Sequence, residues 1–241
     1  MTDWIAPDWP APAQVRALVT TRAGGASEGP YASMNLAAHV GDNAAAVAEN
    51  RRRLRAHVPA EPLWLSQVHG VSVVRAEDAV EGAEADAAFA RRAGRVCAVL
   101  TADCLPVLLC DDAGTVVCAA HAGWRGLAGG VLEAAVHAMD VPPARLMAWL
   151  GPAIGPRAFE VGAEVREAFL AHAPGATTAF TPKANGKWLA DLYRLAELRL
   201  NALGLSRVFG GGYCTYSEAE RFYSFRREKA TGRMASLIWM E

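Results

Sequence analysis

The 241-residue sequence lacks the patterns of secreted, disulfide-rich and membrane proteins. Its five cysteines include no C-x-x-C pair, and an odd number placed mostly in apolar runs argues against a disulfide framework. The N-terminal residues show no basic region followed by an apolar one, which is the pattern of a signal peptide. No apolar stretch reaches the roughly 18 residues of a membrane-spanning helix. We therefore predict a soluble, cytoplasmic protein.

The sequence also has no excess of charge of either sign. It contains 24 Lys and Arg against 25 Asp and Glu, a formal net charge of -1. Because nucleic-acid-binding proteins usually carry a basic excess, we expect no nucleic acid as partner, and no membrane surface either. The H-E-x-x-H helix of zincin proteases is absent, as is the H-x-E with P-C-x-x-C of zinc nucleobase deaminases. Both enzyme classes are excluded.

What the sequence does contain is a succession of short apolar segments and amphipathic helices. Hydrophobic residues make up 52% of the chain, which can form a large core without disulfides. Segments rich in Val and Leu predict strands buried on both faces: 14–21, 62–68, 71–75, 95–101, 105–110, 115–121, 145–150, and three more from residue 207 onward, separated by a Gly-rich turn. Helices are predicted at 44–58, capped by Asp42 or Asn43, and at 126–138, 161–173 and 191–204. This mixture predicts an α/β (α+β) fold with one domain, residues 1–241.

Three residues that commonly bind metals stand at or near the ends of predicted strands. They are His69, Cys104 and His121, and Gly-containing turns follow the two histidines. Two imidazoles and one thiolate suit Zn²⁺ and leave a fourth position open, although Cu²⁺ also accepts these ligands. The alternative is that each is an ordinary core residue, and their spacing of 35 and 17 positions does not decide between the two interpretations.

Two neighbouring features extend this candidate site. Asp103 lies in the middle of an apolar run, where a carboxylate is costly to bury unless it is catalytic or orients a metal-bound histidine. The Gly-rich turn 121–130 contains Arg125 and precedes a predicted helix, so it can hold a phosphate or carboxylate. Tight packing alone is the other explanation for such a turn.

Basic and aromatic residues supply further candidates. Arg22 lies in a Gly-rich loop, and Arg226 is followed by two more arginines, although surface salt bridges explain most arginines. The C-terminal region is rich in aromatic side chains that either stack on a base or belong to the core. The two further arginines are Arg227 and Arg233, and the aromatic residues are Tyr213, Tyr216, Phe222, Tyr223 and Phe225.

Taken in order, the motifs resemble those of the YfiH-type family, also called laccase-domain or purine nucleoside phosphorylase/polyphenol oxidase-like proteins. The resemblance covers nearly the whole chain. The motifs are TTRAGGASEGPYASMNL with HVGDN, LSQVHG, ADAAFA, LTADCLPVLL, HAGWRGLAGG, GPAIGPRAFEVG, GGYCTY and RFYSFRRE with TGRMASLIW. Several such motifs in one order are highly specific, whereas no single one would be.

This resemblance implies a layered sandwich of mixed β-sheets flanked by helices, of the cysteine-hydrolase type shared by CNF and YfiH. It implies one zinc ion on His69, Cys104 and His121. The implied activity is phosphorolysis of adenosine, inosine and methylthioadenosine, together with adenosine deamination. Cys104, His121 and Asp103 are then expected to be catalytic. The residues expected to bind substrate or phosphate are Arg22, Gln67, Arg125 and Arg226.

Other functions use the same residues. A copper-dependent polyphenol oxidase is the redox alternative, but six histidines are few for several copper centres. A cysteine hydrolase would use Cys104 as nucleophile and His121 as base, and relatives are associated with the editing of peptidoglycan precursors. A purely structural zinc would need a fourth ligand such as Cys118 or Cys214. We expect purine nucleosides and phosphate as partners, and a monomer or small homo-oligomer.

Overall fold

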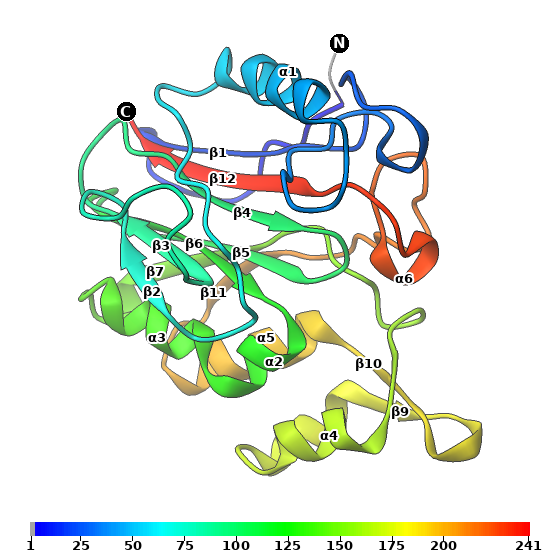
Figure 1. Cartoon of the computed structure of the whole chain (residues 1–241). Helices are drawn as coiled ribbons and strands as arrows, with labels where there is room; N and C mark the ends of the chain where they lie inside the picture. Colours follow the sequence, from blue (N-terminus) through cyan, green and yellow to red (C-terminus); the bar gives the residue numbers. More distant parts are fainter. Residues whose placement is uncertain (1–2) are drawn as a thin grey trace.

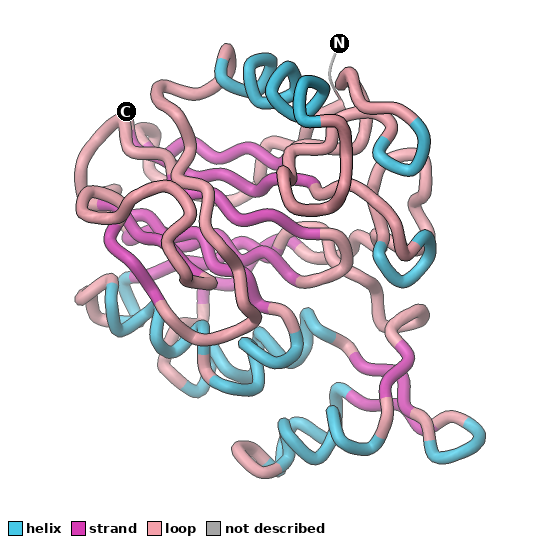
Figure 2. Tube along the Cα trace, in the orientation of Figure 1, coloured by secondary structure: helices cyan, strands magenta, loops and turns pink. Residues whose placement is uncertain are grey.

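Two β-sheets pack face to face, and helices cover both outer faces of the pair (Figures 1 and 2). The computed structural model describes residues 3–241. From one side to the other, the layers are a helix, a three-stranded sheet, a six-stranded sheet and a second helical layer. This arrangement confirms the predicted layered α/β sandwich.

The smaller sheet is antiparallel, with strand order β1-β12-β4. Its strands are β1 (Val15–Val19), β12 (Met234–Met240) and β4 (Cys97–Thr101). Helix α1 (Ala44–Arg55) covers its outer face, and the side chain of Asn43 caps this helix by accepting hydrogen bonds from two backbone N–H groups of its first turn. The predicted cap is therefore confirmed at the second of the two positions.

The larger sheet is mixed, with strand order β11-β7-β5-β6-β3-β2. Only the two edge pairs, β11 with β7 and β2 with β3, are parallel. The strands are β2 (Val73–Arg75), β3 (Ala87–Ala90), β5 (Leu105–Asp111), β6 (Val117–Ala122), β7 (Leu146–Leu150) and β11 (Arg207–Gly210). Its outer face is covered by α2 (Trp124–Gly129), α3 (Val131–Ala138) and α5 (Leu192–Ala202).

Side-chain alternation along the buried strands explains why the sheets stack. In β12, Leu237 packs in the cluster under α1, whereas Ile238 packs in the cluster between the two sheets. In β5, Leu108 faces the layer between the sheets, and Leu109 faces the helices. Every residue of β4, β5, β6, β7 and β12 is buried, as predicted from their continuous apolar runs.

A small excursion between residues 156 and 191 extends from the main body (Figure 1). It contains a second three-stranded sheet, of order β8-β10-β9, and one helix. Its elements are β8 (Glu160–Val161), α4 (Ala163–Leu170), β9 (Phe180–Pro182) and β10 (Trp188–Ala190). The remaining helical segments are the short α6 (Phe225–Glu228) and the 3₁₀ turns Gly29–Tyr31, Pro143–Arg145, Pro174–Ala179 and Ala184–Gly186.

Some predictions of local structure are wrong. Residues 62–68 form no strand, because their backbone makes only two isolated bridges, from Leu63 to Cys97 of β4 and from Ser66 to Glu84. The predicted helix 126–138 is two helices, since Gly130 has a φ of 104° and ends the first. Of the three strands predicted from residue 207 onward, the middle one is absent: no strand lies between the Gly-rich turn at 210–212, where all three glycines have positive φ, and β12. Among residues 3–241, no helix is long and apolar enough to cross a membrane.

Candidate metal centre

The three candidate ligands come from three separate segments that meet at one end of the larger sheet. His121 lies on β6, and Cys104 immediately precedes β5. These strands are antiparallel neighbours, with Pro106 opposite His121, so the register brings the thiol to the imidazole. His69 lies in the loop before β2 and has a left-handed backbone, with a φ of 61°.

The distances among the three side chains suit a zinc ion. Their ligand atoms all lie within 4.8 Å of one another, and the Nε2 atom of His69 is 3.8 Å from the Sγ atom of Cys104. In a tetrahedral zinc site, bonds of about 2.0–2.1 Å to nitrogen and about 2.3 Å to sulfur place such atoms about 3.6 Å apart. Because His121 is buried, Cys104 is partly buried and His69 is exposed, one side of the group faces solvent.

Asp86 organises this group from behind. Its fully buried carboxylate accepts a hydrogen bond from His121 Nδ1 at 2.8 Å, which leaves Nε2 of that ring as the ligand atom. The same carboxylate accepts backbone N–H bonds from Val68, His69 and Gly70 at 3.2, 3.0 and 2.6 Å. One side chain therefore fixes the ring of one ligand and the backbone of another.

Gly123 leaves the space that the ligands occupy. A Cβ atom at this position would lie 2.8 Å from Cδ2 of His69 and 3.1 Å from Sγ of Cys104. A Cβ at Gly126 would lie 2.7 Å from the carbonyl oxygen of Gly70, so this glycine lets α2 approach the loop of His69. The turn after His121 is thus Gly-rich because it packs against the ligands.

The charges of the group favour a thiolate. Burial opposes ionisation of Cys104, but the charge of His121 and hydrogen bonds from His121 and His69 lower the pKa of the thiol. Burial disfavours the imidazolium of His121, yet Cys104 and Asp86 raise the pKa of this histidine. Burial of Asp86 is likewise outweighed by its hydrogen bonds to His121 and the loop, which lower the pKa of the carboxyl. A deprotonated thiol is the form that binds metals.

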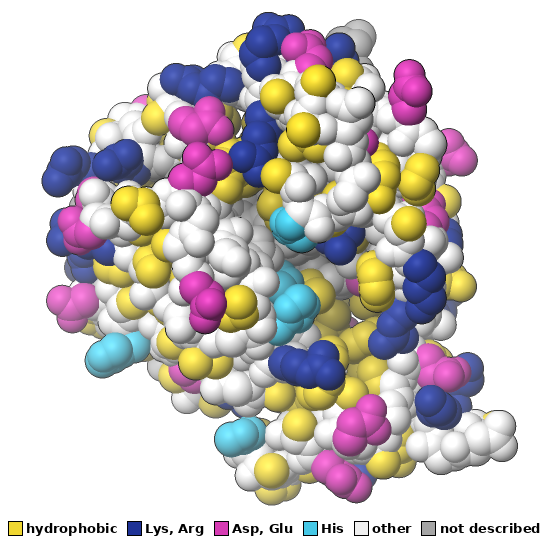
Figure 3. All heavy atoms as spheres, in the orientation of Figure 1, with side chains coloured by type: hydrophobic (Ala, Val, Ile, Leu, Met, Phe, Trp, Pro, Cys, Tyr) yellow, Lys and Arg dark blue, Asp and Glu magenta, His cyan; other side chains and the backbone are white. Residues whose placement is uncertain are grey.

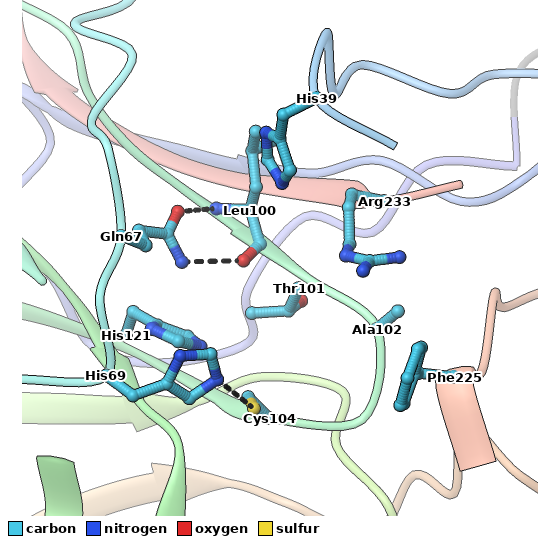
Figure 4. A pocket seen from close by; sticks show the side chains of 10 residues that line it. All are labelled: His39, Gln67, His69, Leu100, Thr101, Ala102, Cys104, His121, Phe225 and Arg233. Atoms are coloured by element: carbon cyan, nitrogen blue, oxygen red, sulfur yellow. Dashed lines mark hydrogen bonds between the residues drawn. The ribbon is translucent and has the colours of Figure 1, made fainter. Parts of the chain in front are cut away.

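A pocket of about 240 Å³ opens over the three ligands. Figure 3 shows a hollow in this face, with histidine side chains at its edge and Lys or Arg side chains around it. Figure 4 shows His69, His121 and Cys104 at one end, and His39 and Arg233 on the opposite wall. The remaining lining residues are Gln67, Leu100, Thr101, Ala102 and Phe225.

Gln67 lines this pocket, but its amide is used by the fold. Its Nε2 donates to the carbonyl oxygen of Leu100 at 2.9 Å, and its Oε1 accepts from the N–H of Leu100 at 2.7 Å. These bonds satisfy the free edge of β4 in place of a neighbouring strand (Figure 4). This side-chain pairing is why residues 62–68 need no strand conformation of their own.

Asp103 is buried beside Cys104, and its carboxylate points to other partners. It accepts a hydrogen bond from the Thr215 hydroxyl at 2.6 Å and from the backbone N–H of Arg226 at 2.7 Å. It therefore ties the turn of Cys104 to α6, whose first residue is Phe225. The carboxylate that contacts a metal-ligand histidine is that of Asp86.

The three arginines expected to hold phosphate lie outside the pocket lining. The guanidinium of Arg22 donates to the carbonyl oxygens of Ala32 and Ala219 and pairs with Glu228. Arg125 is exposed and stacks on Trp124, with Cζ 4.4 Å from the ring centroid. Arg226 donates from its side chain to the carbonyl oxygen of Glu160.

Sequence reasoning missed Asp86 and His39, and it named Arg233 among the basic candidates without choosing it as a phosphate ligand. Asp86 carried the same signal as Asp103, an acid between small apolar residues in the ADAAFA motif, and buried acids need partners. Cys118 packs in the core against the helical layer, and Cys214 accepts bonds from Gly155 and Ser217. The ligand group found among residues 3–241 contains neither cysteine.

Comparison with known proteins places the chain in a family. A family model described as multi-copper polyphenol oxidoreductase laccase matches residues 16–241. The chain is 58% identical over 242 residues to a Pseudomonas aeruginosa protein named purine nucleoside phosphorylase, and the match covers 100% of both chains. It is 54% identical over 243 residues to the Escherichia coli purine nucleoside phosphorylase YfiH, again over 100% of both.

Solved structures agree with this placement. A Neisseria meningitidis protein superposes with a TM-score of 0.97 at 53% identity, covering 99% of both chains. YlmD from Geobacillus stearothermophilus superposes with a TM-score of 0.86 at 30% identity, covering 95% of this chain and 93% of the other. The chain therefore belongs to the YfiH-type laccase-domain family, as its ordered motifs predict.

Proposed function

We propose that this chain is a zinc-dependent purine nucleoside phosphorylase that acts on adenosine, inosine and methylthioadenosine. The observation that carries the proposal is the group of His69, Cys104 and His121, a three-ligand set at the bottom of an open pocket. Catalytic zinc sites have three protein ligands and an open position, whereas structural sites have four. Relatives that match the whole chain are named for this activity.

The reaction joins phosphate to the sugar and releases the base. An oxygen of phosphate forms a bond to the anomeric carbon, and the carbon–nitrogen bond breaks, with its electron pair going to the base, which takes up a proton. A zinc ion held by the three ligands would supply a Lewis acid with one open coordination position. Holding both reactants in one pocket can contribute about 7–11 kcal/mol to lowering the barrier.

Residues in and behind the pocket suit separate roles in this reaction. Phe225 is 48% exposed and lines the pocket, so its ring offers a flat apolar face for a purine. We assign Asp86 to orienting His121, and Asp103 to holding α6 and its Phe225 in place. Adenosine deamination at the same site belongs to this proposal as a second activity of the zinc-loaded protein.

A cysteine hydrolase is the second candidate, because Asp86 completes a chain of Cys104, His121 and Asp86. In that reaction the thiolate attacks an acyl carbon, the amine leaves with a proton from His121, and water releases the acid. A peptidoglycan precursor is one substrate of this class. A metal on Cys104 would remove the free nucleophile, so the two candidates predict opposite effects of zinc.

The test compares inosine turnover with and without phosphate. Zinc-loaded protein should release hypoxanthine and ribose 1-phosphate in equal amounts, and only when phosphate is present. Cys104→Ala should abolish this release, whereas Cys214→Ala, a matched change outside the ligand group, should retain it. No phosphate-dependent release from fully metallated protein would refute the phosphorylase. Turnover of an acyl substrate that survives complete chelation would favour the cysteine hydrolase.

Metal content tests the redox alternative. Residues 3–241 provide one three-ligand group, which is fewer than several copper centres would need. Protein produced without added metals should contain about one zinc per chain by elemental analysis. Copper at that stoichiometry would contradict the choice of zinc.

A further inference from the structure

The wall opposite the metal ligands carries a cationic residue whose function remains to be explained. Arg22 and Arg226 use their guanidinium groups on other parts of the fold, and Arg125 lies outside the pocket lining. Arg233 is the arginine that lines the pocket (Figure 4). A charged group in that position calls for an anionic partner.

The fold fixes Arg233 firmly at this wall. Its backbone N–H donates to Oδ1 of the buried Asn35 at 2.9 Å, and its carbonyl oxygen accepts from the N–H of Leu36. Its Nη1 atom donates to the carbonyl oxygens of Thr231 and Gly232 at 2.9 and 3.0 Å. Two hydrogen bonds of the backbone and two of the side chain therefore fix the direction of the guanidinium.

The other face of the guanidinium is directed to the pocket. Across residues 3–241, no acidic side chain forms a salt bridge with Arg233. Burial lowers the pKa of Arg233, while the charges of Cys104 and Asp103 raise it. The carboxylate of Asp103 is already engaged with Thr215 and a backbone N–H, so it leaves the guanidinium without a counter-ion of its own.

His39 supplies a second polar group on the same wall. Its ring lines the pocket beside Arg233 in Figure 4. Partial burial and the positive charges of Arg233 and Arg51 lower the pKa of His39, which favours the neutral ring, and a neutral imidazole can donate one N–H. Phe225 closes the other side, with the Cζ atom of Arg233 5.9 Å from its ring centroid.

We propose that Arg233 and His39 form an oxyanion subsite that binds the tetrahedral phosphate across the pocket from the metal ligands. The planar guanidinium offers a two-pronged donor set for phosphate oxygens, and the histidine adds one further donor. The subsite deepens the proposed function, because it gives the phosphate that phosphorolysis consumes a place in the same pocket. Free inorganic phosphate is its ligand, rather than the phosphate group of a nucleotide.

Binding measurements without nucleoside test the subsite separately from turnover. Phosphate is titrated into zinc-loaded protein by calorimetry, for wild type, Arg233→Gln and His39→Gln. Loss of a charge-assisted hydrogen-bonded contact should weaken phosphate binding about 10- to 100-fold in Arg233→Gln, and less in His39→Gln. Arg125→Gln is the matched control and should bind phosphate as wild type does.

A chemical measurement on the wild-type protein covers the case in which Arg233→Gln fails to fold. Phenylglyoxal modifies accessible arginines, and peptide mapping reads the modification of each one. Phosphate should protect Arg233 but not Arg125, which is exposed and does not line the pocket. The assignment would be overturned if phosphate protected both arginines equally, protected neither of them, or protected Arg125 alone.

Further results distinguish free phosphate from a nucleotide as the ligand, and distinguish failure of the subsite from failure of the phosphorylase proposal. A nucleoside 5′-monophosphate that binds more tightly than its nucleoside, with the advantage lost in Arg233→Gln, would assign the subsite to a nucleotide instead. Phosphate binding that depends on Arg233 in a protein without phosphorolysis would leave the subsite standing and refute the phosphorylase. Phosphorolysis that is unchanged in Arg233→Gln would refute the subsite alone.

Discussion

Replacement of Asp86 by Asn should separate the organisation of the metal site from the stability of the fold. Each carboxylate oxygen of Asp86 accepts two of its four hydrogen bonds, one oxygen from His121 and His69 and the other from Val68 and Gly70. Whichever way an Asn amide turns, its NH₂ group faces two donors. Since Asp86 is fully buried, water cannot replace the lost acceptor.

The size of the effect follows from these contacts. Leaving a buried donor without a partner costs about 1–3 kcal/mol, so two such donors should lower the free energy of unfolding by about 2–6 kcal/mol in metal-free protein. Loss of the carboxylate behind a ligand histidine typically lowers metal affinity about 10- to 100-fold. Urea unfolding measures the first quantity, and zinc competition with a chromogenic chelator measures the second.

The control is Asp112→Asn, which removes an exposed carboxylate that pairs with Arg145. An exposed ion pair contributes about 0–1 kcal/mol, so this variant should keep both stability and zinc affinity. Wild-type zinc affinity in a folded Asp86→Asn protein would refute the argument that this carboxylate organises the ligands.

Three other predictions test neighbouring parts of the site. Gly123→Ala should lower zinc affinity at least about 10-fold while the fold is retained, because its Cβ would press on His69 and Cys104. The control is Gly175→Ala, whose Cβ would point into open space, and it should leave zinc affinity unchanged in the same chelator assay. Asp103→Asn should lower the free energy of unfolding by about 1–3 kcal/mol through loss of its bond to the Arg226 N–H; a large drop in kcat with unchanged urea stability would instead show a proton-transfer role. Zinc at 100 times its Kd should stabilise the chain by about 2.7 kcal/mol and raise the Tm by about 5–10 °C in calorimetry, and an equal rise in Cys104→Ala would show that zinc binds elsewhere.

The buried strands were predictable because their sequence pattern directly reflects burial. Strands β4 to β7 consist mainly of Val, Leu, Ala and Cys, a composition that suits a layer covered on both faces. The segment 62–68 has a similar composition but is not a strand, because the Gln67 side chain makes the bonds that a backbone would make. A side chain that replaces a strand partner leaves no periodic signal.

The metal ligands were predictable from their motifs, but the partners around them were not. His69, Cys104 and His121 each belong to a recognisable motif, and His121 is the one of the three that lies within a strand. Asp86 and Arg233 meet them only through the pairing of distant strands, with β3 beside β6 and β12 beside β4. For the same reason, the sequence does not show what the other arginines contact. The guanidinium groups of Arg22 and Arg226 bind backbone carbonyl oxygens, and that of Arg125 stacks on Trp124.

The two walls of the pocket belong to different sheets. The metal ligands lie at the end of the six-stranded sheet, whereas Arg233 directly precedes β12 of the three-stranded sheet. The apolar layer between the sheets, including Val99, Leu108 and Trp149, therefore acts as a spacer that sets how far apart the two walls stand. A protein engineer who wishes to admit a bulkier ligand could then adjust the thickness of this layer, and leave every residue that lines the pocket unchanged.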